Sequence, residues 1–246
     1  MAGTNWINDE LTAFDLETTG IDPFVDVPVS YAYIHRTRFG TSVRMESQAG
    51  LVNPGRPIPE EAMAVHKITD EMAAEGFKLV DAIDGLAGML SDAWARHSAI
   101  VGMNVSYDLT MIDACCRDLG LASLAERGPI GSVVDVMVLD RHLDRYRSGR
   151  RNLGALCEVY GVVNVSAHAA IGDAAASLDV LDAIVARYPQ LQEMTLDEVG
   201  KAMGVWSAEW LTSFSAYRVE RGDSPIEPHR FSWPIYAEPE TFTPTV

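Results

Sequence analysis

Residues 13–20, AFDLETTG, place two carboxylates, Asp15 and Glu17, two positions apart in what the neighbouring apolar residues predict is a buried strand. Side chains two residues apart point to the same face of a strand. Burying ionised carboxylates is costly unless a cation meets them. Either one of the pair is solvated at the end of the strand, or a metal ion binds both and takes its other ligands from elsewhere in the chain.

The composition limits the class of protein. The chain has 246 residues, 48% of them hydrophobic, which suits one generous domain or a domain with an appendage. It contains no apolar run of about 18 residues, and its first ten residues lack the pattern of a secretory signal. The three cysteines fit no disulfide or zinc spacing and are expected to be small buried thiols. We therefore expect a cytoplasmic protein without a membrane span.

The net charge of −16 argues against a protein that holds long duplex nucleic acid by neutralising its phosphates. It leaves open nucleic-acid chemistry at a metal-loaded site, because bound cations invert the local field. One basic segment interrupts this background, with five arginines at 141, 145, 147, 150 and 151. They either steer a phosphate chain toward a crevice or form a solvated helix end.

The hydrophobic periodicity predicts an α/β fold in which helices pack on a mixed, five-stranded sheet. The first three strands form an antiparallel meander, and the last two are parallel and alternate with helices. The expected strands lie at 11–17, 29–35, 43–51, 98–102 and 132–139. The expected helices lie between 57 and 96 and at 105–119, 152–160 and 170–187.

Three units are expected along the chain. The main domain covers residues 8–189. A helical C-terminal extension follows at 190–224, with two helices over 195–221 and with Trp206 and Trp210 available to dock on the main body. A proline-rich tail, residues 225–246, is expected to be extended.

Two further acids occupy places comparable to that of the first pair. Asp108 follows the strand at 98–102 near the start of the next helix, and Asp173 lies in the first turn of the helix at 170–187. Strand ends and helix starts converge on one crevice in an open sheet. His168 precedes Asp173 by five residues. Each residue alone is a weak signal, but their order and context favour a common site for a hard cation with oxygen ligands.

These residues fall in three motifs that resemble those of the DEDDh exonucleases. The motifs are DLETTG at 15–20, NVSYD at 104–108 and HAAIGD at 168–173. The family is named for its four acids and its histidine. It has a ribonuclease H-like fold and includes the proofreading subunit of bacterial replicative polymerases, oligoribonuclease and ribonuclease T. The resemblance extends over residues 10–188. VHKIT at 65–69 also resembles a family segment, with Lys67 in place of the usual glycine.

The resemblance implies a 3′–5′ exonuclease that hydrolyses single-stranded nucleic acid to nucleoside 5′-monophosphates. DNA is favoured over RNA as the substrate, but no single residue reports a pocket for the 2′ hydroxyl, so the choice between them stays open. It implies that Asp15, Glu17, Asp108 and Asp173 hold two divalent cations, Mg²⁺ or Mn²⁺, and that His168 is the general base. Contacts to the terminal nucleotide are implied for Thr18, Thr19, His66 and Asn104. The residues alone permit other roles: the threonine hydroxyls can cap the strand end, His66 can be structural, and Asn104 can fix the loop before Asp108.

Other functions remain open at this point. The chain can be an inactive nuclease-fold module that binds nucleic acid or a polymerase, or a two-metal hydrolase of another class. Proofreading beside a polymerase, repair and RNA processing all fit the motifs. Residues 190–246 can form a homodimer contact or a site for a replication or repair partner.

Overall fold

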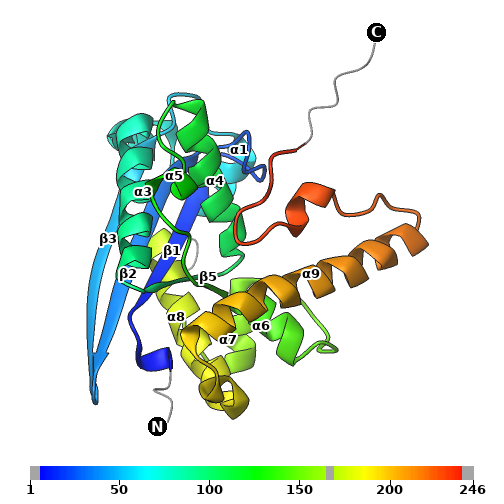
Figure 1. Ribbon diagram of the computed structural model, residues 1–246. Coiled ribbons are helices and arrows are strands. Elements are labelled where there is room, and N and C mark those ends of the chain that lie inside the picture. Colours follow the sequence, from blue (N-terminus) through cyan, green and yellow to red (C-terminus); the bar gives the residue numbers. More distant parts are fainter. Residues whose placement is uncertain (1–5, 165–168, 240–246) are drawn as a thin grey trace.

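The computed structural model describes residues 6–164 and 169–239, and Figure 1 shows helices on both faces of one sheet. The elements in chain order are η1 (Trp6–Asn8), β1 (Leu11–Thr18), β2 (Pro28–Phe39), β3 (Ser42–Asn53), α1 (Glu60–His66), α2 (Asp70–Ala74), β4 (Phe77–Lys78), α3 (Leu79–Ala95), β5 (Ala99–Gly102), α4 (Val105–Asp118), α5 (Leu124–Arg127), β6 (Val133–Asp135), α6 (Val136–Leu143), α7 (Leu153–Tyr160), α8 (Ala170–Arg187), η2 (Pro189–Glu193), α9 (Leu196–Glu220) and η3 (Pro228–Phe231). None of these helices has the length and apolar character needed to cross a lipid bilayer.

The sheet confirms the predicted mixed α/β architecture. Its strands, within the described residues, lie in the order β4-β3-β2-β1-β5-β6. β1, β2 and β3 form the antiparallel meander, while β5 and β6 extend the sheet in parallel with β1. There are six strands rather than five. The additional strand, β4, pairs only with Val52 and Asn53, and two residues are too few to show an alternating hydrophobic pattern.

Two expected strands differ from the structure. The strand predicted at 132–139 ends at Asp135, whose carboxylate accepts hydrogen bonds from the backbone N–H groups of Met137 and Val138 and so caps helix α6. The first part of β3 is exposed rather than half-buried, and Val43 and Met45 are 51% and 49% accessible. Periodicity alone therefore overestimated the length of one strand and the burial of another.

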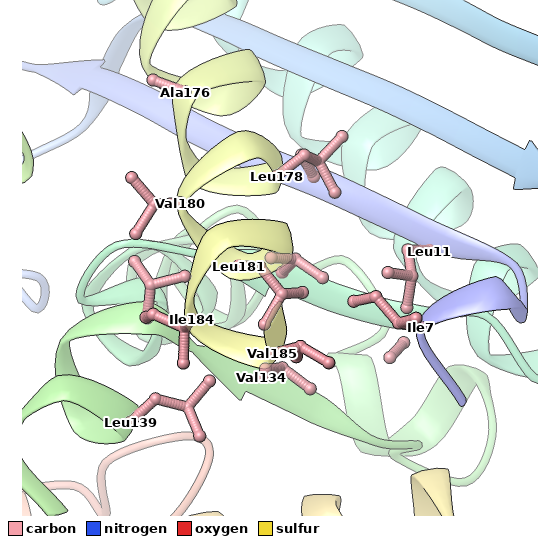
Figure 2. Close-up of a cluster of buried hydrophobic side chains, with 14 of the residues drawn as sticks. Ile7, Leu11, Val134, Leu139, Ala176, Leu178, Val180, Leu181, Ile184 and Val185 are labelled. Carbon is pink, nitrogen blue, oxygen red and sulfur yellow. The ribbon is translucent and has the colours of Figure 1, made fainter. Parts of the chain in front are cut away.

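The core fixes the direction in which the first two acids point. Leu11 and Ala13 of β1 face α8, and Figure 2 shows Leu11 beside the apolar side of that helix, with Leu178 and Leu181. Each fully buried side chain of this size contributes about 1.5–3 kcal/mol. Phe14 belongs to a second cluster, on the opposite face, under α3 and α4. Because side chains alternate along a strand, Asp15 and Glu17 continue the row of Leu11 and Ala13.

The C-terminal extension contains one long helix, α9, instead of the two expected over 195–221. Thr195 and Glu198 form a capping box at its start. Gly200 and Gly204 let α9 approach its neighbours closely, since an added Cβ would lie 2.7 Å from Ser132 Oγ at the first and 3.2 Å from Trp233 at the second. Trp206 does dock as expected, stacking on His142 with ring centroids 4.1 Å apart.

The described part of the proline-rich tail is not simply extended. It forms the short helix η3, and Trp233 then packs against both hydrophobic clusters. Figure 1 shows this segment, in red, returning from the end of α9 toward α4. The backbone N–H of Tyr236 donates a hydrogen bond of 2.9 Å to Thr110 Oγ1 of α4. The tail is therefore tied to the main domain.

Only part of the arginine cluster is a solvated surface: Arg145 and Arg150 are exposed, whereas the other three are partly buried. Arg147 and Arg151 both form ion pairs with Asp140, which is fully buried. Tyr160 also donates its hydroxyl hydrogen to Asp140, at 3.0 Å. Two of the five arginines thus neutralise a buried carboxylate, and Arg141 is itself partly buried.

Candidate active site

Three carboxylates from two distant segments meet beside β1. Asp15 and Glu17 lie near the end of this strand, and Asp173 lies in the first turn of α8, which packs on the same face. One oxygen of each carboxylate can be chosen so that all three lie within 4.8 Å of one another. Asn164 donates a hydrogen bond of 2.6 Å to Asp173 Oδ1 and so restrains its orientation. The structure thus brings together three of the four predicted metal ligands.

Asp108 lies next to this group but is not one of the three. It belongs to the first turn of α4 and is 5% exposed. The negative charge of Asp108 contributes to raising the pKa of Asp15, and the negative charge of Glu17 contributes to raising the pKa of Asp108. Backbone N–H groups of Leu16 and of Asp108 itself stabilise its carboxylate, but burial still raises its pKa well above the usual value. His168, the expected general base, lies outside the described residues.

The carboxylates destabilise one another in the ionised state. The pKa of Asp15 is raised well above its usual value, mainly by burial and then by repulsion from Asp108, Asp173 and Glu17. Burial, followed by repulsion from Asp173, raises the pKa of Glu17 from 4.5 to about 7. A bound cation would relieve this repulsion, and an all-oxygen donor set suits Mg²⁺ or Mn²⁺. The residues present therefore fit a divalent metal site.

The two threonines after Glu17 build the loop that follows β1. Thr18 Oγ1 donates a hydrogen bond to the carbonyl of Gly20, and the Tyr107 hydroxyl donates to the same carbonyl, at 2.7 and 2.6 Å. Thr19 Oγ1 donates to Asp26 Oδ1 at 2.8 Å. These bonds hold the loop in shape, which is the capping role that the sequence had left open. Tyr107, although inside the second motif, was not singled out from the sequence.

His66 is buried beside Thr18. Its Nδ1 accepts a hydrogen bond of 3.0 Å from the backbone N–H of Ile68, so the proton of the neutral ring is on Nε2, which has no partner among the described residues. Burial lowers its pKa. The ring lines a groove of about 350 Å³ that also borders the start of α8. Lys67 follows with a φ of 64°, a conformation that explains why glycine is usual at this position.

Asn104 takes the support position before Asp108. It has a φ of 59° and precedes α4, while the next N–H, of Val105, donates to Asp135 Oδ2 at 3.0 Å. Asp135 therefore fixes the starts of both α4 and α6. No local pattern in the sequence predicts this link or the bond between Asn164 and Asp173, because both join segments that meet only in the folded chain.

Comparison with known proteins decides the family. The sequence model of the exonuclease family matches residues 12–181. The chain belongs to the exonuclease family. This confirms the recognition of a DEDDh-type, DnaQ-like domain from its motifs. The chain is 30% identical over 201 residues to a DNA polymerase III subunit epsilon-like protein of Rhodobacter capsulatus, covering 78% of this chain and 27% of that protein. It is 23% identical to the DNA polymerase III subunit epsilon of Treponema pallidum, covering 72% and 77% of the two chains.

Solved structures similar to the chain share its ribonuclease H-like fold. Exonuclease I of Methylocaldum szegediense superimposes with a TM-score of 0.63 at 24% identity, covering 85% of this chain and 46% of that one. Exonuclease I of E. coli, in complex with a dA16 oligonucleotide, gives 0.63 at 19% identity, covering 75% and 42%. The chain thus spans less than half of these structures and 27% of the Rhodobacter relative.

Proposed function

We propose that this exonuclease removes nucleotides from the 3′ end of single-stranded nucleic acid, DNA in preference to RNA, and releases nucleoside 5′-monophosphates. The observation that carries the proposal is the meeting of Asp15, Glu17 and Asp173 within 4.8 Å, with Asp108 buried beside them. The complex of E. coli exonuclease I with an oligonucleotide supports the choice of a DNA strand.

In this proposal the four carboxylates hold two divalent cations, Mg²⁺ or Mn²⁺, because four negative charges at one site are balanced by two dications. When bound, such cations lower the pKa of a coordinated water and stabilise charge on phosphate oxygens. Asn164 orients Asp173, and the loop held by Thr18 and Thr19 borders the site. His168 accepts the proton of the attacking water, since a neutral imidazole is available near physiological pH.

The proposal extends to the surroundings of the domain. Residues 8–189 form the exonuclease domain, and residues 190–246 form an extension that serves a partner or a second copy of the chain. The relatives named as DNA polymerase III subunits favour a polymerase or another replication or repair protein as the partner, in the cytoplasm. His66, Thr18, Thr19 and Asn104 border the position of the terminal nucleotide.

The test follows the degradation of 5′-labelled DNA and RNA oligonucleotides with Mg²⁺, Mn²⁺ or a chelator. We expect a ladder shortened from the 3′ end, abolished by the chelator, by a blocked 3′ end and by Asp15→Ala or Asp173→Ala. Glu158→Gln, a change of an exposed residue of α7, serves as the control and keeps full activity. His168→Ala is expected to slow turnover by about 10²-fold or more. Undiminished activity of Asp15→Ala, or release of nucleotides from the 5′ end, would reject the proposal.

A further inference from the structure

A second cavity lies on the other side of α4 from the carboxylates. It has a volume of about 240 Å³ and lies between α6, α9, the start of α4 and the C-terminal segment after η3. We call it the C-terminal pocket and define it by six of its lining residues: Ser106, Arg141, Trp210, Arg218, Trp233 and Tyr236. Ser106 and Asp108 are two positions apart on α4, so their side chains leave the helix on nearly opposite sides. The pocket therefore does not share the four carboxylates of the candidate metal site, although Asn104, at the start of α4, lies between the two and also lines the pocket.

One lining residue of the pocket, Arg141, carries a cation whose Nε is buried and has no hydrogen-bond partner in the described part of the chain. The guanidinium of Arg141 lies over the ring of Trp210, 3.5 Å from its centroid. Burial lowers the pKa of Arg141 to about 10, and Asp135 partly opposes this effect. The oxygens of Asp135, however, already accept the backbone N–H groups that start α4 and α6. The Nε atoms of Arg36 and Arg38 are also unpartnered, but both of those guanidinium groups form ion pairs with Asp182. Arg141, in contrast, forms no ion pair among the described residues.

A second donor in the same cavity is also unsatisfied. Ser106 is 4% exposed, and its hydroxyl has no hydrogen-bond partner among residues 6–164 and 169–239. A hydroxyl and a guanidinium that line one cavity are both satisfied by an anion with several acceptor oxygens. Arginine in particular matches the geometry of a phosphate group.

The walls and rim add aromatic surfaces and further positive charge. Trp210 and Phe214 are stacked with centroids 4.7 Å apart, and Trp233 and Tyr236 line the cavity from the C-terminal segment. Arg218 reaches the pocket and is held by a hydrogen bond from its Nε to a backbone carbonyl. Arg141 and Phe214 already lie against the ring of Trp210. Trp233 and Tyr236 are therefore the aromatic lining residues left for a nucleobase, and any base can use them by stacking. Three arginines in one pocket, including Arg230, are notable in a chain of net charge −16.

We propose that the C-terminal pocket binds a nucleotide, with its phosphate on Arg141 and Ser106 and its base against the aromatic walls. This site is separate from the metal site and goes beyond the proposed function, because it requires binding alone. The nucleotide is either a free 5′-monophosphate or one unit within a longer strand. The chemistry is the same in both cases, and the two sources are distinguished by experiment.

The test measures binding of dAMP, deoxyadenosine and a 3′-blocked dA8 oligonucleotide to the full chain in a chelator, by calorimetry and tryptophan fluorescence. Without metal, the neighbouring carboxylates repel phosphate, so binding reports on the pocket. We expect dAMP to bind at least tenfold more tightly than deoxyadenosine. Arg141→Gln should weaken dAMP binding at least tenfold, whereas Arg150→Gln, a change of an exposed arginine that does not line the pocket, should change it less than twofold.

Arg218→Gln, nearer the surface, provides a second variant if Arg141→Gln fails to fold, and it should weaken binding at least threefold. Tighter binding of dA8 than of dAMP, with the same loss in the variants, identifies a strand nucleotide as the ligand. Binding of dAMP alone identifies a free nucleotide. Affinities that are equal in wild type and variants, or no binding of either ligand at millimolar concentration, would overturn the proposal. Because no cleavage is measured, failure of the proposed exonuclease activity leaves these outcomes unchanged.

Discussion

Replacing Glu17 by glutamine should stabilise the metal-free protein while removing a metal ligand. In the folded chain, burial and the charge of Asp173 raise the pKa of Glu17 from 4.5 to about 7. Between these values the folded state retains a proton that the unfolded state has lost, so the free energy of unfolding decreases as the pH rises. The penalty is absent below about pH 4.5 and complete above about pH 7. Glutamine is neutral throughout and avoids it.

The expected size follows from the same pKa. A rise from 4.5 to about 7 corresponds to at most about 3 kcal/mol. Because the Glu17 side chain is only partly buried, solvent screening reduces this to about 1–2 kcal/mol. For a chain of this length the melting temperature should rise by about 3–6 °C.

The assay is thermal unfolding of wild type and Glu17→Gln in a chelator at pH 5 and pH 8, with Glu158→Gln as the matched control. The variant should melt above wild type at pH 8, and the gap should be smaller at pH 5. Saturating Mg²⁺ should reverse the order, because a ligand that binds only the folded state at 100 times its Kd adds about 2.7 kcal/mol to the protein that retains the site. A gap that is absent at pH 8, or equal at both pH values, would refute the electrostatic reasoning.

Two further predictions concern stability. Asp140→Ala leaves the buried ends of Arg147 and Arg151 without their partner and should reduce the free energy of unfolding by about 3–5 kcal/mol, measured by urea denaturation; a loss below about 1 kcal/mol would contradict this role. Gly76→Ala places a Cβ 2.4 Å from the backbone carbon of Leu51, so the strand must shift. We expect a loss of about 1–3 kcal/mol for this variant, and an unchanged urea midpoint would show that the backbone yields freely.

The family and the direction of the acids on β1 could be predicted from the sequence. The three motifs are contiguous, and each falls beside a strand or helix start that its own periodicity reveals. Alternation along residues 11–17 places Asp15 and Glu17 on one face without any knowledge of the partner strands. The meander and the parallel direction of the last two strands were also predicted correctly, although the last of them is shorter than expected and ends at Asp135.

Other features depend on contacts between distant segments. Strand β6 ends at Asp135 because the side chain of this residue accepts hydrogen bonds from two backbone N–H groups of the following helix. The apolar residues of the sequence continue past this point. Phe77 and Lys78 form strand β4 only because the folded chain places them beside Val52 and Asn53, with which they pair. Asp108 lies beside the group of three carboxylates rather than within it. These three features depend on distances between segments that are far apart in the chain, and the order of residues in the sequence does not specify such distances.

The sequence by itself determined the chemical groups and the elements that carry them, because hydrophobic periodicity and motif spacing are local properties of the backbone. The tertiary structure alone decided which of those groups share a site. Gly200 and Gly204 allow α9 to approach its neighbours closely, and the fold places the Arg141 guanidinium against Trp210, with its Nε unpartnered among the residues that the structure describes. Packing sets such distances between segments far apart in the chain, and the energy of an electrostatic or hydrogen-bonded contact depends on them.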